Sequence, residues 1–425
     1  MVDMDDDLPH KTSIADSTGW TAEMVESADA IPHDIWDTCA GNQNPLLSHA
    51  FFSALENSQS ACADTGWIPR HLVLRDHSEQ ICGILPLYLK THSYGEYVFD
   101  HSWADAWRRA GGQYYPKAQS GIPFSPVPGQ RLLIDPSLPA EQARDAAAVL
   151  AKACLGCVDQ LGLSSAHITF LSKDEHDALT LTSPDASTDA SPNASPNASP
   201  DTPAGEWISR IGMQFHWHNN SYQDFDDFLS RLASRKRKSI RRERRDIANA
   251  GVRLVQKQGD DLTAADWDQF YSFYLATIDR KWGGAYLTRD FFDQIHNSMR
   301  DHILLVIASH DGDPVAGAIN FIGQDTLYGR NWGSLVDIPF LHFETCYYQA
   351  IDFAIANGLA RVEAGAQGLH KVQRGYEPVY TYSVHHMNNV SFQDAVRDFT
   401  AREASQIERE RQELLTWLPY KNSAL

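Results

Sequence analysis

The sequence has few cysteines, no long apolar run and an acidic start. Six cysteines are scattered over 425 residues, which does not match the disulfide framework of a small secreted domain. No stretch reaches the roughly 18 apolar residues that a membrane-spanning helix needs, so we expect no integral membrane segment. The opening MVDMDDDLPH is acidic, whereas a secretory leader has a basic start and an apolar core. Together these features predict reduced thiols and a cytoplasmic location.

A recognisable metal site is also missing from the sequence. Cys154 and Cys157 form a CLGC, but this lies within a predicted helix at 140–161 and no second cysteine pair accompanies it. His385 and His386 lie in the alternating run TYSVHHM, and the period of a strand would place their side chains on opposite faces. We therefore expect no metal.

Basic residues are outnumbered, with 36 Lys and Arg against 55 Asp and Glu, so the surface as a whole is not one that attracts nucleic acid. One segment departs from this average: nine of the fifteen residues from Arg231 to Arg245 are Lys or Arg, and one, Glu243, is acidic. A basic helix is predicted over 224–250, with an apolar face and a separate cationic stripe. The stripe consists of Arg235, Lys238, Arg242 and Arg245. It predicts contact with phosphates or RNA, and the alternative is a solvated helix paired with nearby carboxylates.

A segment rich in Ser, Pro, Asn, Asp and Ala at 182–206 divides the chain, and it lacks the apolar residues needed to pack. We expect it to be a disordered linker between a first domain at 21–181 and a second at 207–425. Residues 1–20 are expected to be disordered as well.

The two halves resemble each other. Residues 72–95 and 304–329 both read as apolar strand, polar turn, apolar strand and Tyr-Gly, with Gly83 to Gly95 spaced as Gly317 to Gly329. A long helix follows in each half, at 140–161 and 342–357, and then a short strand, at 167–171 and 361–365. Two further helices are predicted before the second hairpin, at 263–279 and 289–300.

Helix, helix, three antiparallel strands, helix and strand is the element order of the Gcn5-related N-acyltransferase (GNAT) fold. Two such units in tandem resemble the Fem aminoacyl ligases, and more closely the FemAB-like, peptidoglycan biosynthesis/recognition group. The segments that carry this resemblance are SRKRKSIRRER (234–244), DRKWGGAYLT (279–288), YGRNWG (328–333), FETCYYQAIDFAI (343–355) and EAGAQGLHKVQRGYEP (363–378). The resemblance implies an α/β fold with a mixed sheet and two tandem GNAT-like domains. It also implies acyl or aminoacyl transfer to an amine acceptor. The expected acceptor is a cell-envelope, peptidoglycan-related precursor.

The donor stays open between aminoacyl-tRNA and an acyl-coenzyme A. Fem ligases draw their amino acid from aminoacyl-tRNA, which makes the basic helix relevant to tRNA binding. Coenzyme A enzymes of this fold hold the pyrophosphate on glycine-rich backbone amides at a helix start. At that position this sequence reads GSLVDIPFLHFE (333–344), with bulky residues after one glycine, so the coenzyme A signature is absent.

Candidate site residues gather in the second half. Arg330, Asn331 and Trp332 end a predicted strand, and Lys281 and Trp282 precede a Gly-Gly pair; we predict that these five bind substrate. Acyl transfer to an amine needs a base, for which Glu363 and His370 are the candidates. Substrate or oxyanion contacts are predicted for Gln367, Lys371, Arg374 and Tyr376 of the same loop. A charged surface turn with Arg374 paired to Glu377 is the alternative.

The first half lacks such a loop and is predicted to be a degenerate copy. Its insert, with Tyr114, Tyr115, Lys117 and Gln119, is predicted to reach over a cleft between the domains. Two further functions stay open: a non-catalytic module that binds a peptidoglycan precursor or RNA, and an acetyl-coenzyme A-dependent N-acetyltransferase.

Overall fold

The computed structural model describes residues 13–15, 19–181, 207–279, 284–366 and 368–421. The predicted linker at 182–206 and three predicted site residues, Lys281, Trp282 and Gln367, lie outside the described residues. So does most of the segment 1–20, but Ser13–Ala15 form strand β1 and pair with β2 (Thr21–Val25). The expected disorder over 1–20 therefore does not hold for these three residues.

The second half has the predicted order of elements, which confirms the mixed α/β class. After β11 (Val252–Gln258) come α8 (Ala264–Asp279), α9 (Arg289–Met299), β12 (Ile303–His310), β13 (Asp313–Ile322), β14 (Thr326–Ser334), α10 (Leu341–Phe343), a π-helical turn η5 (Glu344–Tyr348), α11 (Gln349–Ala356) and β15 (Arg361–Glu363). The helix predicted at 342–357 is therefore present, but it is interrupted by the π turn. A π turn adds one residue to the helical repeat and shifts the face on which later side chains lie.

The first half follows a similar order with additions. Its elements are α1 (His33–Ala40), α2 (His49–Asn57), β3 (Trp67–Pro69), β4 (His71–Arg75), β5 (Ile81–Leu85), β6 (Leu87–Lys90), α3 (His101–Arg109), β7 (Lys117–Ser120), β8 (Leu133–Ile134), α4 (Ala140–Gln160), β9 (Ser165–Leu171) and α5 (Lys173–Leu181). Gly83 and Gly317 occupy matching places, since each lies in the second strand of its hairpin. The match of Tyr94 to Tyr328 was wrong: Tyr94 lies in a turn and is 61% exposed, whereas Tyr328 is buried within β14. The equal glycine spacing is therefore not a structural equivalence beyond the hairpin.

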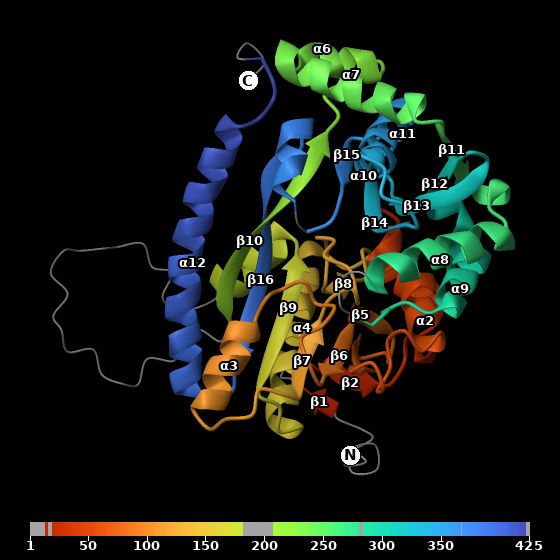
Figure 1. The fold of residues 1–425 in the computed structure, drawn as a ribbon. Coiled ribbons are helices and arrows are strands. Elements are labelled where there is room, and N and C mark those ends of the chain that lie inside the picture. The colour runs from red at the N-terminus through yellow and green to blue at the C-terminus, as the bar shows by residue number, and fades with distance from the viewer. Residues whose placement is uncertain (1–12, 16–18, 182–206, 280–283, 367, 422–425) are drawn as a thin grey trace, which may run out of the picture.

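One sheet of eleven strands runs through both halves, in the order β11-β12-β13-β14-β15-β10-β16-β9-β7-β6-β3. Its two central strands, β10 (Ile208–His218) and β16 (Glu377–Met387), pair with each other along nine residues. β10 also pairs with β15, and β16 pairs with β9 of the first half. The long helix α12 (Val390–Thr416) lies along β10 and β16 (Figure 1). A second sheet, β1-β2-β4-β5-β8, belongs to the first half.

Helices cover both faces of the sheet in the second half. Aromatic and aliphatic side chains of α8 and α9 pack with those of β12 and β13 and with α2 of the first half in one large core cluster. On the other face, η5 and α11 pack against β10 and β15. In the first half Cys154 and Cys157 are buried in the apolar core beneath α4. None of the described helices is long and apolar enough to cross a membrane.

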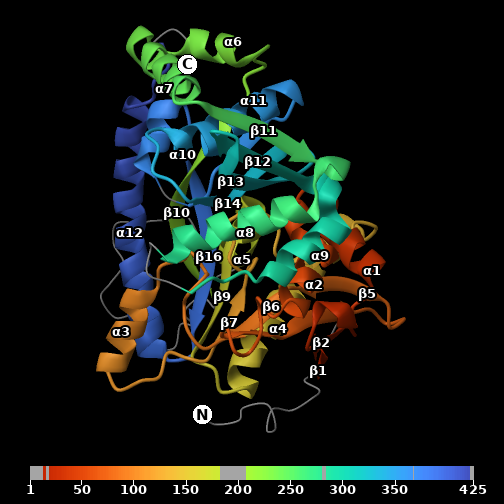
Figure 2. The same ribbon diagram turned by 45° about the vertical axis from the view of Figure 1, so that its right-hand side comes forward.

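The basic helix predicted over 224–250 is two helices, α6 (Phe225–Arg231) and α7 (Ser234–Asn249). The chain is extended at Leu232 and Ala233, where Leu232 is fully buried and forms a β-bridge with Tyr420. The prediction was wrong here because it followed charge spacing along one axis, whereas Leu232 leaves that axis to reach the core. Both helices lie together at one end of the molecule (Figure 2).

Gly333 provides a test of the packing of β14 on α8. A methyl group built on Gly333 would lie 2.1 Å from the backbone carbonyl carbon of Phe273 in α8, a contact that no rotamer change relieves. We expect Gly333→Ala to lower the free energy of unfolding by about 1–3 kcal/mol, measured by thermal and denaturant unfolding. Gly284→Ala is the control, because nothing lies within 4 Å of its added methyl group. Equal stability of the two variants would contradict this packing.

Candidate functional site

The parallel strands β14 and β15 pair briefly and then separate. Their pairing covers Thr326–Tyr328 and Arg361–Glu363, after which β14 continues beside β13 and the chain leaves the sheet behind Glu363. A bulge lies just beyond this point, because Arg330 and Asn331 of β14 both stand opposite Ile319 of β13. Bulges re-aim side chains and end pairing, and they are frequent beside active sites.

A pocket occupies the place where the strands part. It is lined by Ala318, Ile319, Asn320, Gly329, Arg330, Asn331, Trp332, His342, Cys346, Tyr347 and Ala364. The structure thus brings together three of the predicted site residues, Arg330, Asn331 and Trp332. Arg330 also donates a hydrogen bond to the carbonyl oxygen of Phe124, so the first half contacts the rim of this pocket.

The loop after Glu363 contains a short 3₁₀ helix, η6 (Leu369–Arg374). Gly365 and Gly368 have φ angles of 77° and 120°, which favour glycine, so these two residues let the chain turn back on itself. Lys371 is 1% exposed and its Nζ donates to the carbonyl oxygen of Gly365 at 2.8 Å. The pKa of Lys371 is lowered to about 7, chiefly by burial and with a smaller effect of Arg330, against the opposing effect of Cys346. A substantial fraction of this amine is therefore uncharged near neutral pH.

Glu363 is buried at the end of β15, on the side of the strand opposite Ala364. Its Oε1 lies 3.2 Å from Nε of Arg361 and 3.7 Å from Nδ1 of His216, while Oε2 has no hydrogen-bond partner among the described residues. Burial raises the pKa of Glu363 to about 7, against the opposing effect of Arg361. Glu363 does not line the pocket, but it is close enough to Arg330 for the guanidinium to lower its pKa.

His370 contacts the pocket through another residue. Its Nε2 lies 2.8 Å from the hydroxyl oxygen of Tyr347, which lines the pocket. Its ring also lies near those of His342 and Phe343. Burial lowers the pKa of His370, and Arg374 and Lys371 lower it further, so the imidazole is held neutral.

Two loop residues are held inside the protein. Arg374 is 8% exposed and donates to Glu243 at 2.9 Å, to the hydroxyl of Tyr348 at 2.9 Å and to the carbonyl oxygen of His370 at 2.9 Å. The surface pair with Glu377 considered from the sequence is therefore replaced by a buried pair with Glu243. Tyr376 is fully buried in the core around α11. Both residues shape the loop, and neither lines the pocket.

Four lining residues with polar, titratable or thiol side chains were not predicted from the sequence: Asn320, His342, Cys346 and Tyr347. His342 belongs to α10, and Cys346 and Tyr347 belong to the π turn, so an unbroken α-helical repeat does not place these three on one face. Asn320 is a polar residue within an apolar strand and 1% exposed. A buried polar side chain in such a run was the one signal that the sequence offered.

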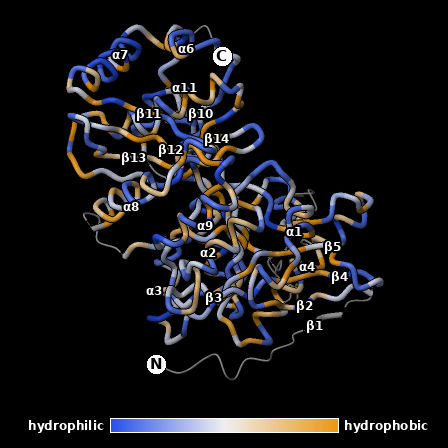
Figure 3. Tube along the Cα trace, turned by 90° about the vertical axis from the view of Figure 1, so that its right-hand side faces the viewer, coloured by the Kyte–Doolittle hydropathy of each residue, from blue (hydrophilic) through white to orange (hydrophobic). Residues whose placement is uncertain are grey.

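The cationic stripe of α7 is exposed to solvent. Arg235, Lys238, Arg242 and Arg245 are all classed as exposed, and α7 is largely hydrophilic (Figure 3). Arg242 lies 4.0 Å from Asp246, and the other three make no ion pair within the described part of the chain. The remaining cations of the run are engaged elsewhere, for example Arg241 with Asp226 at 2.7 Å.

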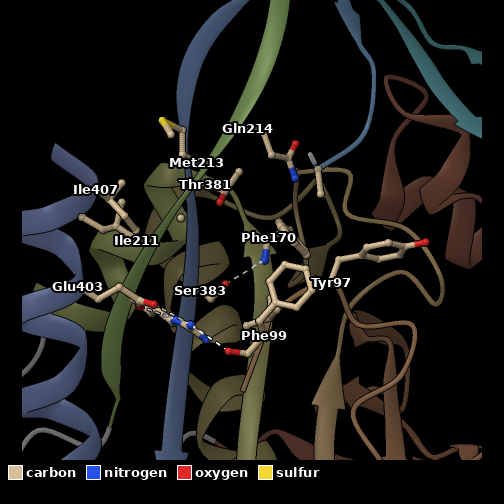
Figure 4. A pocket seen from close by; sticks show the side chains of 14 residues that line it. Tyr97, Phe99, Phe170, Ile211, Met213, Gln214, Thr381, Ser383, Glu403 and Ile407 are labelled. Carbon is tan, nitrogen blue, oxygen red and sulfur yellow. Dashed lines mark hydrogen bonds and ion pairs between the residues drawn. The ribbon is translucent and has the colours of Figure 1, made fainter. Parts of the chain in front are cut away.

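A groove lies between the halves (Figure 4). β10 and β16 contribute Ile211, Met213, Thr381 and Ser383, α12 contributes Glu403 and Ile407, and the first half contributes Tyr97, Phe99 and Phe170. Ala366 of the loop after β15 also lines the groove. The groove, with a volume of about 190 Å³, therefore reaches the loop that carries Lys371.

The sequence model of the FemAB-like family, described as peptidoglycan biosynthesis/recognition, matches residues 27–422. This chain belongs to the FemAB-like family. The match confirms the resemblance that was based on five segments of the sequence. Among curated proteins no sequence matches the chain.

Solved structures are similar to this FemAB-like chain at low identity. FemX is 11% identical, covers 88% of this chain and 100% of its own, and gives a TM-score of 0.49. L-PGS from Bacillus licheniformis is 9% identical, with coverage of 82% and 94% and a TM-score of 0.45. A tandem GNAT protein from the clavulanic acid biosynthesis pathway is 11% identical, with coverage of 87% and 99% and a TM-score of 0.39. These identities are too low to transfer an activity.

In the first half of this FemAB-like protein the corresponding strand gap is filled. β7 and β9 form the matching parallel pair, and beyond it the side chain of Arg131 lies buried. Arg131 donates to the carbonyl oxygens of Thr169, Val127, Gly129 and Gln130 at 2.6–3.2 Å. In the first half this position is therefore occupied by the side chain of Arg131.

The sequence predicted that the insert reaches over a cleft through Tyr114, Tyr115, Lys117 and Gln119. None of these four residues lines the groove between the halves, whereas Tyr97 and Phe99 of the same insert do. Tyr114, Lys117 and Gln119 are buried, with exposures of 4%, 0% and 1%. Lys117 lies between the carboxylates of Glu96 and Asp100, at 2.7 and 2.5 Å. The prediction failed because the charge of Lys117 suggested a solvent-exposed side chain, whereas two carboxylates accompany it into the core.

Glu363 makes the stability of the protein depend on pH. A carboxyl group whose pKa rises from 4.5 to about 7 on folding favours the folded state fully below pH 4.5, and this contribution is lost as the pH rises through 7. Glutamine carries no such charge. We therefore expect Glu363→Gln to match the wild type near pH 4.5 and to be more stable above pH 7, by up to about 3 kcal/mol.

Denaturant unfolding across this pH range measures the difference. Glu410→Gln, on the exposed side of α12, is the control and should show no such trend. A stability difference between Glu363→Gln and the wild type that does not grow as the pH rises would contradict the burial of an ionisable carboxyl group at this place.

Proposed function

We propose that this FemAB-like protein transfers an acyl or aminoacyl group to an amine on a peptidoglycan-related precursor, in the pocket between β14 and β15. The observation that carries the proposal is the parting of these strands at a bulge that presents Arg330 and Asn331, beside a loop that holds Lys371. The family description supports the peptidoglycan context.

The reaction forms a bond between the acceptor nitrogen and the acyl carbon and breaks the ester or thioester of the donor. A proton leaves the attacking amine, and the departing oxygen or sulfur receives one. Arg330 and Asn331 are placed to donate hydrogen bonds to the acyl oxygen as negative charge develops on it. Lys371 does not itself line the pocket. In this proposal it acts from the adjacent loop, taking up a proton when neutral or stabilising the oxyanion when charged.

Of the two predicted bases, His370 rather than Glu363 is connected to the pocket. In this proposal Lys371 takes up the proton of the attacking amine, and His370 serves the transfer of a proton to the leaving group. The neutral imidazole of His370 is hydrogen bonded to the hydroxyl of Tyr347, which faces the pocket. Tyr347 can therefore donate its proton to the leaving group and recover one through His370. Glu363 lies on the side of β15 that carries Arg361, and in this proposal it sets the local charge.

An RNA ester is the favoured donor. The exposed cations of α7 fit a phosphate backbone. Where coenzyme A enzymes have glycines, this chain has Phe340 just before α10 and Leu341 and Phe343 within it, and Leu341 is buried. Bulky side chains there leave less room for a pyrophosphate on the helix amides.

For the acceptor we propose the groove between the halves, since it runs from Ala366 along β10 and β16 (Figure 4). Its floor combines apolar side chains with the hydroxyls of Thr381 and Ser383 and the amide of Gln214. Such a lining suits a chain of amide bonds with small side chains.

The direct test incubates the purified protein with tRNA charged with radiolabelled amino acids and with amine-bearing cell-wall precursors. Transfer converts an alkali-labile ester into an alkali-stable amide, so stable label in the precursor measures the reaction. Label that appears only with acyl-coenzyme A would replace the proposed donor. Tight precursor binding without transfer from either donor would favour the non-catalytic module.

Replacing Lys371 tests the assignment of the pocket. We expect Lys371→Met to lower kcat/KM about 100-fold or more, because it removes both the proton acceptor and the positive charge. Lys371→Arg should keep the charge but recover little activity, since its guanidinium stays protonated. Lys152→Met, on an exposed face of α4, is the matched control and should keep full activity. Full activity of Lys371→Met would overturn the assignment.

A further inference from the structure

Helix α7 has two faces with different partners. The exposed face carries the cationic stripe of Arg235, Lys238, Arg242 and Arg245. The inner face carries Lys236, Ile240, Glu243, Arg244 and Ile247, which recur at spacings of one, three or four residues. The single acidic residue between Arg231 and Arg245 thus points inward, away from the stripe.

Glu243 holds the loop of the candidate site. It is 7% exposed, and its Oε2 accepts hydrogen bonds from Arg374 and from the hydroxyl of Tyr348. The same guanidinium donates to the backbone carbonyl of His370. Arg374 therefore links the carboxylate of Glu243 on α7 to the backbone of His370. A buried ion pair of this kind loses much more when one partner is removed than it contributes as a pair.

Further contacts attach the inner face of α7 to the elements around the pocket. Lys236 donates to the side-chain oxygen of Gln373, which precedes Arg374 in the loop. Arg244 lies 3.1 Å from Glu344 of the π turn and 2.6 Å from Asp352 of α11. The inner face of α7 therefore contacts both the loop and the helix that line or support the pocket.

On the outer face, among the residues that the structure describes, Arg242 lies 4.0 Å from Asp246 and the other three cations make no ion pair. Four cations at spacings of three or four residues repel one another along the helix. A polyanion bound there would remove this repulsion and hold α7 against the elements beneath it. Charge complementarity favours RNA, because the stripe has the regular spacing and exposure that suit a phosphate backbone.

We propose that α7 couples RNA binding on its outer face to the ordering of η6 (Leu369–Arg374) through Glu243, Arg374, Lys236 and Gln373. Glu243 and Gln373 are positioning residues in this arrangement: they set the backbone of His370 and Lys371 and touch neither donor nor acceptor. The inference rests on the proposed RNA donor. It adds that arrival of the RNA prepares the loop for the transfer.

For the variant Glu243→Gln, coupling and simple electrostatics predict opposite changes in the affinity for RNA. Glu243→Gln removes a negative charge from a basic helix, so electrostatics alone predicts tighter RNA binding. Coupling is reciprocal, so a loosened loop must weaken the binding of RNA. We expect Glu243→Gln to bind fluorescently labelled deacylated tRNA about five-fold more weakly by anisotropy. Asp246→Asn, an exposed acid on the same helix, is the matched control and should bind as tightly as the wild type or more tightly.

Gln373→Ala gives a second variant without a change of charge, which serves if Glu243→Gln loses its fold by circular dichroism. It removes the contact with Lys236, and we expect it also to weaken tRNA binding. Glu243→Asp keeps the charge and should recover part of the affinity. Hydrogen exchange of the 369–374 amides should slow on addition of tRNA in the wild type and in Asp246→Asn, and not in Glu243→Gln.

The outcomes separate this inference from the proposed function. If the double variant Arg235→Glu/Lys238→Glu binds tRNA as tightly as the wild type does, the proposal of an RNA donor is overturned, and the proposed coupling is overturned as well. If that double variant loses binding while Glu243→Gln and Gln373→Ala bind tRNA at least as tightly as the wild type, the coupling alone is overturned.

Discussion

The pairing of β14 with β15 lasts for three residue pairs, and the arrangement of the site depends on where it stops. Parallel strands that part leave unpaired backbone and a gap that side chains, a ligand or water must fill. In the second half the bulge at Arg330 and Asn331 keeps the gap open as a pocket. In the first half the matching gap is filled by Arg131, whose guanidinium bonds to backbone carbonyls. The two halves thus have similar strands, but the gap is a pocket in the second half and is filled by one side chain in the first.

The loop after β15 is charged in sequence and yet buried in the structure. Glu363, Lys371 and Arg374 are all less than 9% exposed, and a buried charge is costly unless it is paired or neutralised. Arg374 is paired with Glu243, whereas Glu363 and Lys371 have pKa values near 7, close to neutrality. The same burial that removes these groups from water therefore makes them able to exchange protons near neutral pH, which general acid–base chemistry requires.

The order of elements in the second half could be predicted because local patterns determine it: apolar runs, polar turns, and glycine at the end of α11. The exposed stripe followed from helical spacing for the same reason. Long-range contacts could not be predicted. Leu232 interrupts the basic helix because its side chain is buried in the core. The π turn places Tyr347 at the pocket, and Arg374 pairs with Glu243 rather than with Glu377. Each depends on a partner distant in sequence, and the local pattern of a single sequence contains no signal for it.

Alkylation of Cys346 tests most directly whether transfer takes place between β14 and β15. Cys346 is half-buried and lines the pocket, and a Cys62→Ser background removes the other half-buried thiol. The account predicts that alkylation of Cys346 abolishes transfer, and that a non-hydrolysable aminoacyl-RNA analogue slows the alkylation. Full transfer activity in protein quantitatively alkylated at Cys346 would contradict it.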